Sequence, residues 1–142
     1  MQILIVEDNA FNAYCLSRLF AFINKKLEIR IVNSSFAALS YLRENNPALV
    51  ILDGDLGVSD GLHCNGPALA NLIWLTNPLL PIVIWSDSEA MRTAFTDVFG
   101  QHEKLINEHN CWPKVVSAER ISSSLPFLLN FRSPQRAASV RH

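Results

Sequence analysis

The feature that most constrains the fold is a set of short apolar, β-branched runs set apart along the chain: "QILIV" at 2–6, "ALVIL" at 48–52 and "PIVIW" at 81–85. Each run is almost continuously apolar, whereas a strand with one wet face alternates apolar and polar residues. Continuous runs of this length are typical of parallel strands covered by helices on both faces. A fourth run, "EIRIV" at 28–32, alternates more and indicates a strand nearer the edge.

Segments with a helical period separate these runs, so strand and helix alternate along the chain. The segments are 10–24, 34–45, 66–75 and 88–99. We expect Phe11 on the buried face of the first and Gly100 as the stop of the last. The alternation predicts an α/β sandwich with a mostly parallel sheet.

The end of the chain follows the pattern less clearly. A fifth strand is expected within the polar stretch 101–114, at either 105–107 or 110–112. The closing helix is expected over 117–131. Pro126 lies inside that segment, which predicts a break near Ser124 or a late start.

The bulk properties exclude several classes of protein. A chain of 142 residues with net charge −1 is about one domain, and its charge favours neither nucleic acid nor a membrane as a direct partner. We expect the domain over 1–131, with the small, polar and basic segment 132–142 as a flexible tail or the start of a linker. The three scattered cysteines, the lack of a signal-peptide pattern and the lack of an apolar stretch of ~18 residues predict a cytoplasmic protein.

Polar residues gather where the predicted strands end. Glu7 and Asp8 follow the first run, Asp53 ends the third strand with Asp55 close behind, and Ser86 follows the fourth. Ligands of doubly wound sheets bind off the carboxyl ends of the strands. If the first, third and fourth strands are neighbours, these side chains converge.

Converging carboxylates repel one another, and a cation relieves that repulsion. Hard oxygen ligands at this density suit Mg²⁺, which can also hold a phosphoryl oxygen. Lys114, where a fifth strand could end, supplies a second cation. An aspartate in such a cluster is a plausible nucleophile that forms an aspartyl-phosphate.

Taken together, four stretches resemble the receiver domain of two-component response regulators, and the first is most similar to receivers of hybrid histidine kinases. They are "ILIVEDNAFN" at 3–12, "LVILDGDL…DG" at 49–61, "IVIWSD" at 82–87 and "PKVVSAERI" at 113–121. The resemblance covers about residues 2–130. It implies a five-stranded parallel sheet of flavodoxin-like, doubly wound topology, in the order 2-1-3-4-5, with helices on both faces.

The resemblance also implies roles for the acidic residues. Asp53 matches the phospho-acceptor, which takes a phosphoryl group from a histidine kinase or a histidine phosphotransfer protein. Asp8 matches a direct Mg²⁺ ligand, Glu7 a ligand through water, and Asp55 falls where the family supplies a backbone carbonyl to the metal. Asp60–Gly61 match the family's "DG" turn. The family's receivers are not enzymes beyond slow self-dephosphorylation, and they switch contacts with a downstream protein partner.

Ser86 and Lys114 match the hydroxyl and the lysine that bond the phosphoryl group. The sequence departs from the family here, because Pro113 precedes the lysine and the spacing from Ser86 is longer. Counting from Gly100 would put Asn107 in its place, with no lysine; we prefer Lys114. We expect Trp85, beside the site, to be partly exposed.

Two other functions compete with a phosphorylated receiver. Asp87, Cys111 and the displaced lysine leave open a receiver-like interaction module that takes no phosphate. "LDGDLG" also resembles the nucleophile motif of haloacid-dehalogenase-type phosphatases. That motif belongs on the first strand of its fold with an acidic pair downstream, whereas the pair here, Glu7–Asp8, lies upstream.

Overall fold

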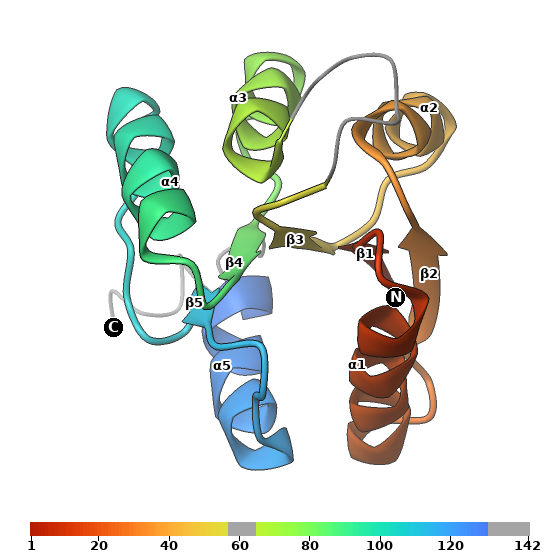
Figure 1. The fold of residues 1–142 in the computed structure, drawn as a ribbon. Coiled ribbons are helices and arrows are strands. Elements are labelled where there is room, and N and C mark those ends of the chain that lie inside the picture. Colours follow the sequence, from red (N-terminus) through yellow and green to blue (C-terminus); the bar gives the residue numbers. More distant parts are fainter. Residues whose placement is uncertain (57–64, 131–142) are drawn as a thin grey trace, which may run out of the picture.

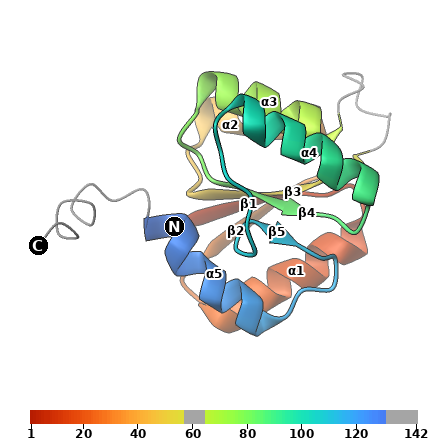
Figure 2. The same cartoon turned by 90° about the vertical axis from the view of Figure 1, so that its left-hand side faces the viewer.

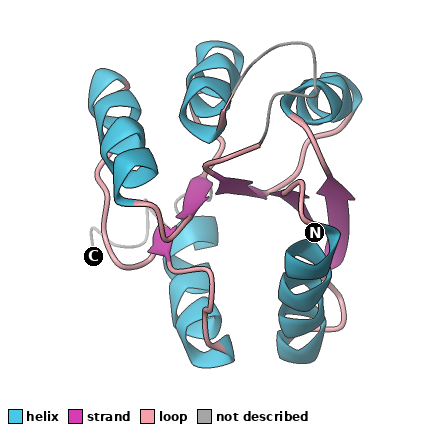
Figure 3. Ribbon diagram, in the orientation of Figure 1, coloured by secondary structure: helices cyan, strands magenta, loops and turns pink. Residues whose placement is uncertain are grey.

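The computed structural model describes residues 1–56 and 65–130. In this part of the chain strands and helices alternate (Figure 1 and, by type, Figure 3). The elements are β1 (Gln2–Val6), α1 (Ala10–Ile23), β2 (Glu28–Val32), α2 (Ser35–Glu44), β3 (Leu49–Asp53), α3 (Gly66–Thr76), β4 (Ile82–Trp85), α4 (Glu89–Gln101), β5 (Cys111–Trp112) and α5 (Ala118–Asn130). None of the described helices is long and apolar enough to cross a membrane. The proposed tail at 132–142 lies outside the described residues.

The sheet has five parallel strands in the order β2-β1-β3-β4-β5, which confirms the predicted fold class. Helices α1 and α5 cover one face, and α2, α3 and α4 cover the other (Figures 1 and 2). The fifth strand is the second of the two alternatives, at Cys111–Trp112.

Each face of the sheet carries its own apolar core, because successive side chains of a strand point to opposite faces. Leu4, Val50 and Ile84 pack with α2, α3 and α4 on one side. Ile3, Ile51 and Val83, among others, pack with α1 and α5 on the other. This two-sided burial is why the central strands are continuously apolar, whereas edge strand β2 is partly exposed.

Strand register decides which side chains meet at the carboxyl edge of the sheet. Val6 pairs with Leu52, so Glu7 follows β1 beside the last residue of β3. Asp53 pairs with Trp85, and Trp85 pairs with Trp112. Residues that follow four different strands therefore lie along one edge.

All five described helices begin at a polar cap whose side chain accepts a backbone N–H, as cap preferences predict. The caps are Asn9 for α1, Ser34 for α2, Asn65 for α3, Ser88 for α4 and Ser117 for α5. Because Asn9 caps α1, neither Glu7 nor Asp8 serves as the cap residue of that helix. The Glu7 carboxylate still contacts the start of the helix, because its Oε2 accepts the backbone N–H of Asn9 at 3.2 Å.

Both predicted alternatives, a break near Ser124 and a late start, were wrong, because α5 begins at Ala118 and runs unbroken through Pro126. A proline removes the hydrogen bond to the carbonyl four residues earlier, here that of Ser122. Both Ser122 and Pro126 lie on the exposed face, where water can satisfy that carbonyl. Leu125 and Leu128 are buried on the opposite face and hold the helix against the sheet.

Two smaller expectations were also wrong. Helix α4 passes Gly100, and the chain reverses at Glu103, whose φ is 58°, while the Lys104 N–H donates to the Phe99 carbonyl at 2.8 Å. Phe11 is 73% exposed, since it lies in the first turn of α1, beyond the edge of the sheet.

Candidate functional site

A cluster of three carboxylates lies at the carboxyl edge of the sheet. Glu7 and Asp8 follow β1 and Asp53 ends β3, and one carboxylate oxygen from each lies within 4.8 Å of the other two. Glu7 and Asp53 are buried, with 2% and 5% of their surface exposed, while Asp8 is exposed. The strand pairing of β1 with β3 produces this cluster, as the strand-end argument predicts.

Lys114 brings a positive charge into the cluster from the segment that follows β5. Its ammonium forms an ion pair with Glu7 and a second with Asp53, at 3.0 Å between Nζ and Oδ1. The competing assignment, Asn107, lies elsewhere: it lines a groove with Trp74 and Phe127 on a different part of the molecule. Only Lys114 of the two reaches the carboxylates.

The surroundings of the cluster change the pKa of Asp8. Its pKa is raised above the ordinary value, first because partial burial disfavours the charged form, and then by a hydrogen bond with Glu7 and by the charge of Glu7. The charge of the exposed Asp55 side chain contributes a smaller rise in the same pKa. Asp8 therefore carries a proton more readily than a solvated aspartate.

The donor set fits a divalent cation. Three ionised carboxylates carry three negative charges and Lys114 supplies one positive charge, so two negative charges remain. Clustered carboxylate oxygens are the hard ligands that Mg²⁺ takes, usually with water completing its shell. Asp8 is exposed and Asp53 lies beside it, so these two residues would hold the ion.

Ser86 lies next to the cluster but does not join it by a hydrogen bond in the described part of the chain. Its side chain is buried, and its hydroxyl accepts the backbone N–H of Ser88 at 3.0 Å. Its own N–H donates to the carbonyl of Trp112 at 3.1 Å. The residue is therefore fixed at the junction of β4, β5 and α4.

Trp85 is 2% exposed, so the expectation of a partly exposed ring was wrong. The ring turns inward and lies under the Lys114 ammonium, 4.0 Å from Nζ to the ring centre. Sequence reasoning missed this contact and also Arg92, whose Nε donates to the Ser86 carbonyl at 2.9 Å. The sequence offered one signal for the Trp85 contact: this aromatic residue ends a buried strand and directly precedes Ser86, a candidate site residue.

Two glycines allow the chain to pack closely behind Asp53. A Cβ on Gly66 would lie 2.1 Å from the Asp53 carbonyl oxygen, and a Cβ on Gly54 would lie 2.7 Å from the Cβ of Met91. The Gly66 N–H donates to the Gly54 carbonyl at 2.7 Å. The start of α3 is thereby held against the strand that carries Asp53. The "DG" turn, Asp60–Gly61, lies outside the described residues.

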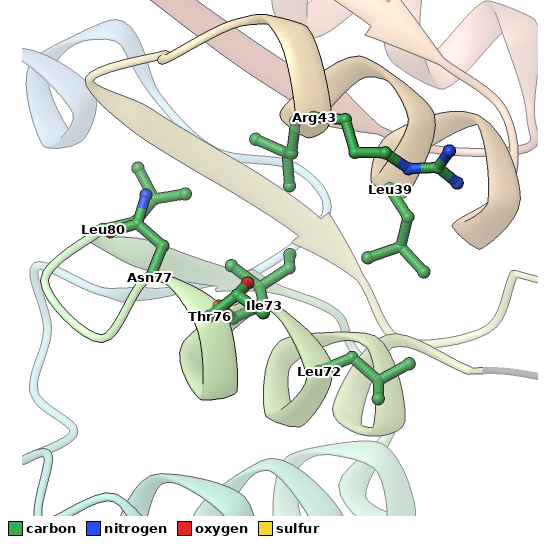
Figure 4. Close-up of a pocket in the computed structure, with 8 residues that line it drawn as sticks. Leu39, Arg43, Leu72, Ile73, Thr76, Asn77 and Leu80 are labelled. Carbon is green, nitrogen blue, oxygen red and sulfur yellow. The ribbon is translucent and has the colours of Figure 1, made fainter.

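A groove of about 540 Å³ between α2 and α3 is a separate feature (Figure 4). It is lined by Leu39, Leu42, Arg43, Leu72, Ile73, Thr76, Asn77 and Leu80. No residue of the carboxylate cluster lines it. Its mainly apolar lining offers no chemistry for group transfer, so the cluster is the candidate reactive site.

Together, the five-stranded order and the position of the cluster define the class: this is the fold of response-regulator receiver domains. No protein-family model and no curated protein matches the chain in sequence. Solved structures do match, and several of them are receiver domains, which confirms the predicted resemblance at the level of the fold.

Among these structures is the receiver domain of NtrX from Brucella abortus. It has a TM-score of 0.68 and 24% identity over 90% of this chain and 98% of that chain. A signal receiver domain of an HD-domain-containing protein from Pseudomonas fluorescens has a TM-score of 0.77 and 16% identity, over 96% of this chain and 91% of that one. Longer NtrX bound to ADP has a TM-score of 0.72 and 22% identity over 99% of this chain. The chain spans 30% of the length of that NtrX.

Proposed function

We propose that this chain is a phosphoryl-accepting receiver domain whose acceptor is Asp53. The observation that carries the proposal is the surroundings of that carboxylate. Asp53 is buried beside Glu7 and Asp8 and is paired with the Lys114 ammonium at 3.0 Å. A nucleophilic aspartate, neighbouring metal-type oxygens and a lysine are the parts that phosphoryl transfer uses.

In the proposed reaction a carboxylate oxygen of Asp53 attacks the phosphorus of a phosphohistidine on a histidine kinase or a phosphotransfer protein. An O–P bond forms at Asp53 as the N–P bond breaks, and the electron pair of that bond stays on the imidazole nitrogen. Lys114 already contacts Asp53, so its ammonium would bond a phosphoryl oxygen after a small displacement. No enzymatic turnover beyond slow self-dephosphorylation is part of the proposal.

Asp8 and Asp53 would hold Mg²⁺, with Glu7 acting through water and Asp55 through its backbone carbonyl. The ion supplies positive charge that neutralises the carboxylates and the incoming phosphoryl oxygens. Asp8 must lose its proton to serve as a ligand, so its raised pKa links metal binding to pH.

The proposed output is a change of protein contacts rather than direct binding of nucleic acid or membrane. The Ser86 hydroxyl would have to turn from the Ser88 N–H toward the phosphoryl group. Ser88 caps α4, so that rotation removes a contact from the start of this helix. The surface of α4 would then present a different arrangement to a downstream protein. A cytoplasmic location, as for the kinases that supply such phosphoryl groups, belongs to the same proposal.

The test is intact-mass spectrometry after incubation with acetyl phosphate and Mg²⁺. The wild-type chain should gain about 80 Da, the mass of one phosphoryl group, and the gain should disappear with EDTA. Asp53→Asn should gain nothing. An unmodified wild type would overturn the proposal and favour the interaction module, whereas steady turnover of p-nitrophenyl phosphate would favour a phosphatase.

A further inference from the structure

Two residues that flank Ser86 form hydrogen bonds with the backbone of Lys114. The backbone N–H of Lys114 donates to Oδ1 of Asp87 at 3.0 Å, and the backbone carbonyl of Lys114 accepts the indole N–H of Trp85 at 3.2 Å. The ammonium of the same lysine lies 4.0 Å from the centre of the Trp85 ring. The carbonyl and the ammonium of Lys114 therefore contact the last residue of β4, and its N–H is held by a residue just after that strand.

These contacts matter because little else in the described structure fixes the backbone of Lys114, although Glu7 and Asp53 pair with its ammonium. Strand β5 has two residues, Cys111 and Trp112, and ends before the lysine. The next residue, Val115, is 91% exposed, and helix α5 begins only at Ala118. A lysine side chain is a flexible stem, so the position of its ammonium depends on where its backbone is held.

We propose that Trp85 and Asp87 are positioning residues that hold Lys114 for the phosphoryl group, an inference that rests on the proposed function. Asp87 fixes the N–H of residue 114, and the Trp85 indole fixes its carbonyl. The Trp85 ring supports the ammonium from below, while Glu7 and Asp53 attract it from the other side.

The orientation of Asp87 supports this assignment. A carboxylate directly after Ser86 would repel an incoming phosphoryl group if it pointed into the site. Instead its Oδ1 accepts the Lys114 N–H and lies 4.0 Å from Nη2 of Arg92, and 63% of the side chain is exposed. Asp87 therefore acts on the site through the lysine.

The ring contact gives a readout that does not depend on phosphorylation. Protons near the face of an indole resonate upfield, so the ε-CH₂ of Lys114 should show an upfield shift in NMR spectra of the wild type. Asp87→Ala should reduce that shift, and Asp87→Asn, whose amide oxygen still accepts the N–H, should restore most of it. Trp85→Leu should abolish it. Asp97→Ala, which removes an exposed carboxylate of α4, is the matched control and should leave it unchanged.

The second readout separates positioning of Lys114 from the metal half of the site. With Mg²⁺ present, Asp87→Ala should weaken binding of beryllofluoride, a phosphoryl mimic, by about fivefold to tenfold, the loss expected for one hydrogen bond. Trp85→Phe, which keeps a ring but loses the N–H donor, should weaken it by a similar factor. The Kd for Mg²⁺ alone should stay within about twofold in both variants.

The proposed function and the positioning role are overturned by different results of these two experiments. If the wild type binds no beryllofluoride, the proposed function is wrong, and the NMR shift alone decides whether Trp85 and Asp87 position the lysine. If Asp87→Ala leaves both the shift and the beryllofluoride affinity unchanged, the positioning role is overturned. Equal losses of Mg²⁺ and beryllofluoride affinity would also overturn it, because a general distortion of the edge would explain them.

Discussion

The site has two halves that are built differently. The acidic half, Glu7, Asp8 and Asp53, follows two central strands that are paired in register over four residues. The other half, Ser86 and Lys114, follows β4 and the two-residue edge strand β5. Strand pairing brings the acidic half together, whereas side-chain contacts to the backbone set much of the second half.

The two halves should respond differently to substitution. The acidic half brings three carboxylates together, and the pKa of Asp8 is raised there, first by partial burial and then by the hydrogen bond with Glu7 and the charge of Glu7. The other half supplies the compensating charge on a segment held by Trp85 and Asp87. Changes in the acidic half should therefore act on metal binding, and changes in the other half should act on stability and on the phosphoryl group.

The substitution Asp8→Asn, in the acidic half, should have the largest effect on Mg²⁺ binding. Removing a direct carboxylate ligand should weaken Mg²⁺ binding by at least about 100-fold, beyond the range seen for changes outside the first coordination shell. Isothermal titration calorimetry measures this Kd, with Asp97→Ala as the control. An unchanged Kd would place the ion elsewhere and break the distinction between the halves.

Asp8 should also give the metal-free protein a pH dependence. Its pKa is raised in the folded state, so between the unfolded and folded values the folded protein binds the extra proton. The stability contributed by that proton is present below the unfolded pKa of 3.8 and is lost as pH rises through the folded value. Urea denaturation across this window should show the loss in wild type and not in Asp8→Asn. Mg²⁺ affinity should rise over the same window, as the ligand loses its proton.

Lys114→Ala should lower the free energy of unfolding by about 3 kcal/mol, near the lower end for breaking a buried ion pair. The lower end applies because the Lys114 side chain is 22% exposed, although that of Glu7 is only 2% exposed. Saturating Mg²⁺ should recover part of the loss, since it supplies positive charge to the same carboxylates. Denaturation with and without Mg²⁺ tests this, and an equal loss in both conditions would contradict a neutralising role. Lys26→Ala, an exposed lysine, should change stability by less than about 0.5 kcal/mol.

A smaller effect is expected from Ser86→Ala. The substitution leaves the Ser88 N–H without its side-chain acceptor, at a cost of about 1 kcal/mol. Mg²⁺ affinity should not change, while beryllofluoride should bind more weakly because one donor to the phosphoryl mimic is lost. Thermal denaturation and titration of both ligands measure the two outcomes. A loss of Mg²⁺ affinity would show that Ser86 contributes to metal binding, as the acidic half does, and would contradict the division of the site.

The smallest effect is expected from Asp55→Ala, since the proposed contribution of this residue to the metal uses its backbone. Mg²⁺-dependent phosphorylation should persist, in contrast to Asp53→Ala. Because the charge of Asp55 raises the pKa of Asp8, removing it should lower that pKa slightly. Intact-mass spectrometry and NMR titration check the two statements. Loss of phosphorylation would assign the Asp55 side chain, rather than its backbone, to the metal.

The acidic half could be predicted from the sequence because its determinants are local. Two-sided apolar strands specify a parallel sheet, and carboxylates that follow neighbouring strands must meet at one edge. The clustering of Glu7, Asp8 and Asp53 is confirmed, and so is the order of the strands. Their proposed chemical roles remain predictions.

The other half was harder to predict because its determinants are distant in sequence. A two-residue strand leaves little periodic signal, so the preference for Lys114 over Asn107 rested on resemblance. The ion pairs of Lys114 with Glu7 and Asp53 support that preference, and its role remains a prediction. Trp85 is buried in a core built from several elements, and its indole N–H meets the carbonyl of a residue much later in the chain. The unbroken helix through Pro126 likewise reflects packing against the sheet, which local propensity cannot show.

The most direct measurement is to locate the phosphoryl group on the chain. After reaction with acetyl phosphate and Mg²⁺, borohydride reduction converts an aspartyl-phosphate to homoserine, and peptide mass spectrometry identifies the altered residue. We expect a single modified position, Asp53, and no modification without Mg²⁺. Modification of Asp8 or Asp55 instead, or of no aspartate at all, would contradict this expectation.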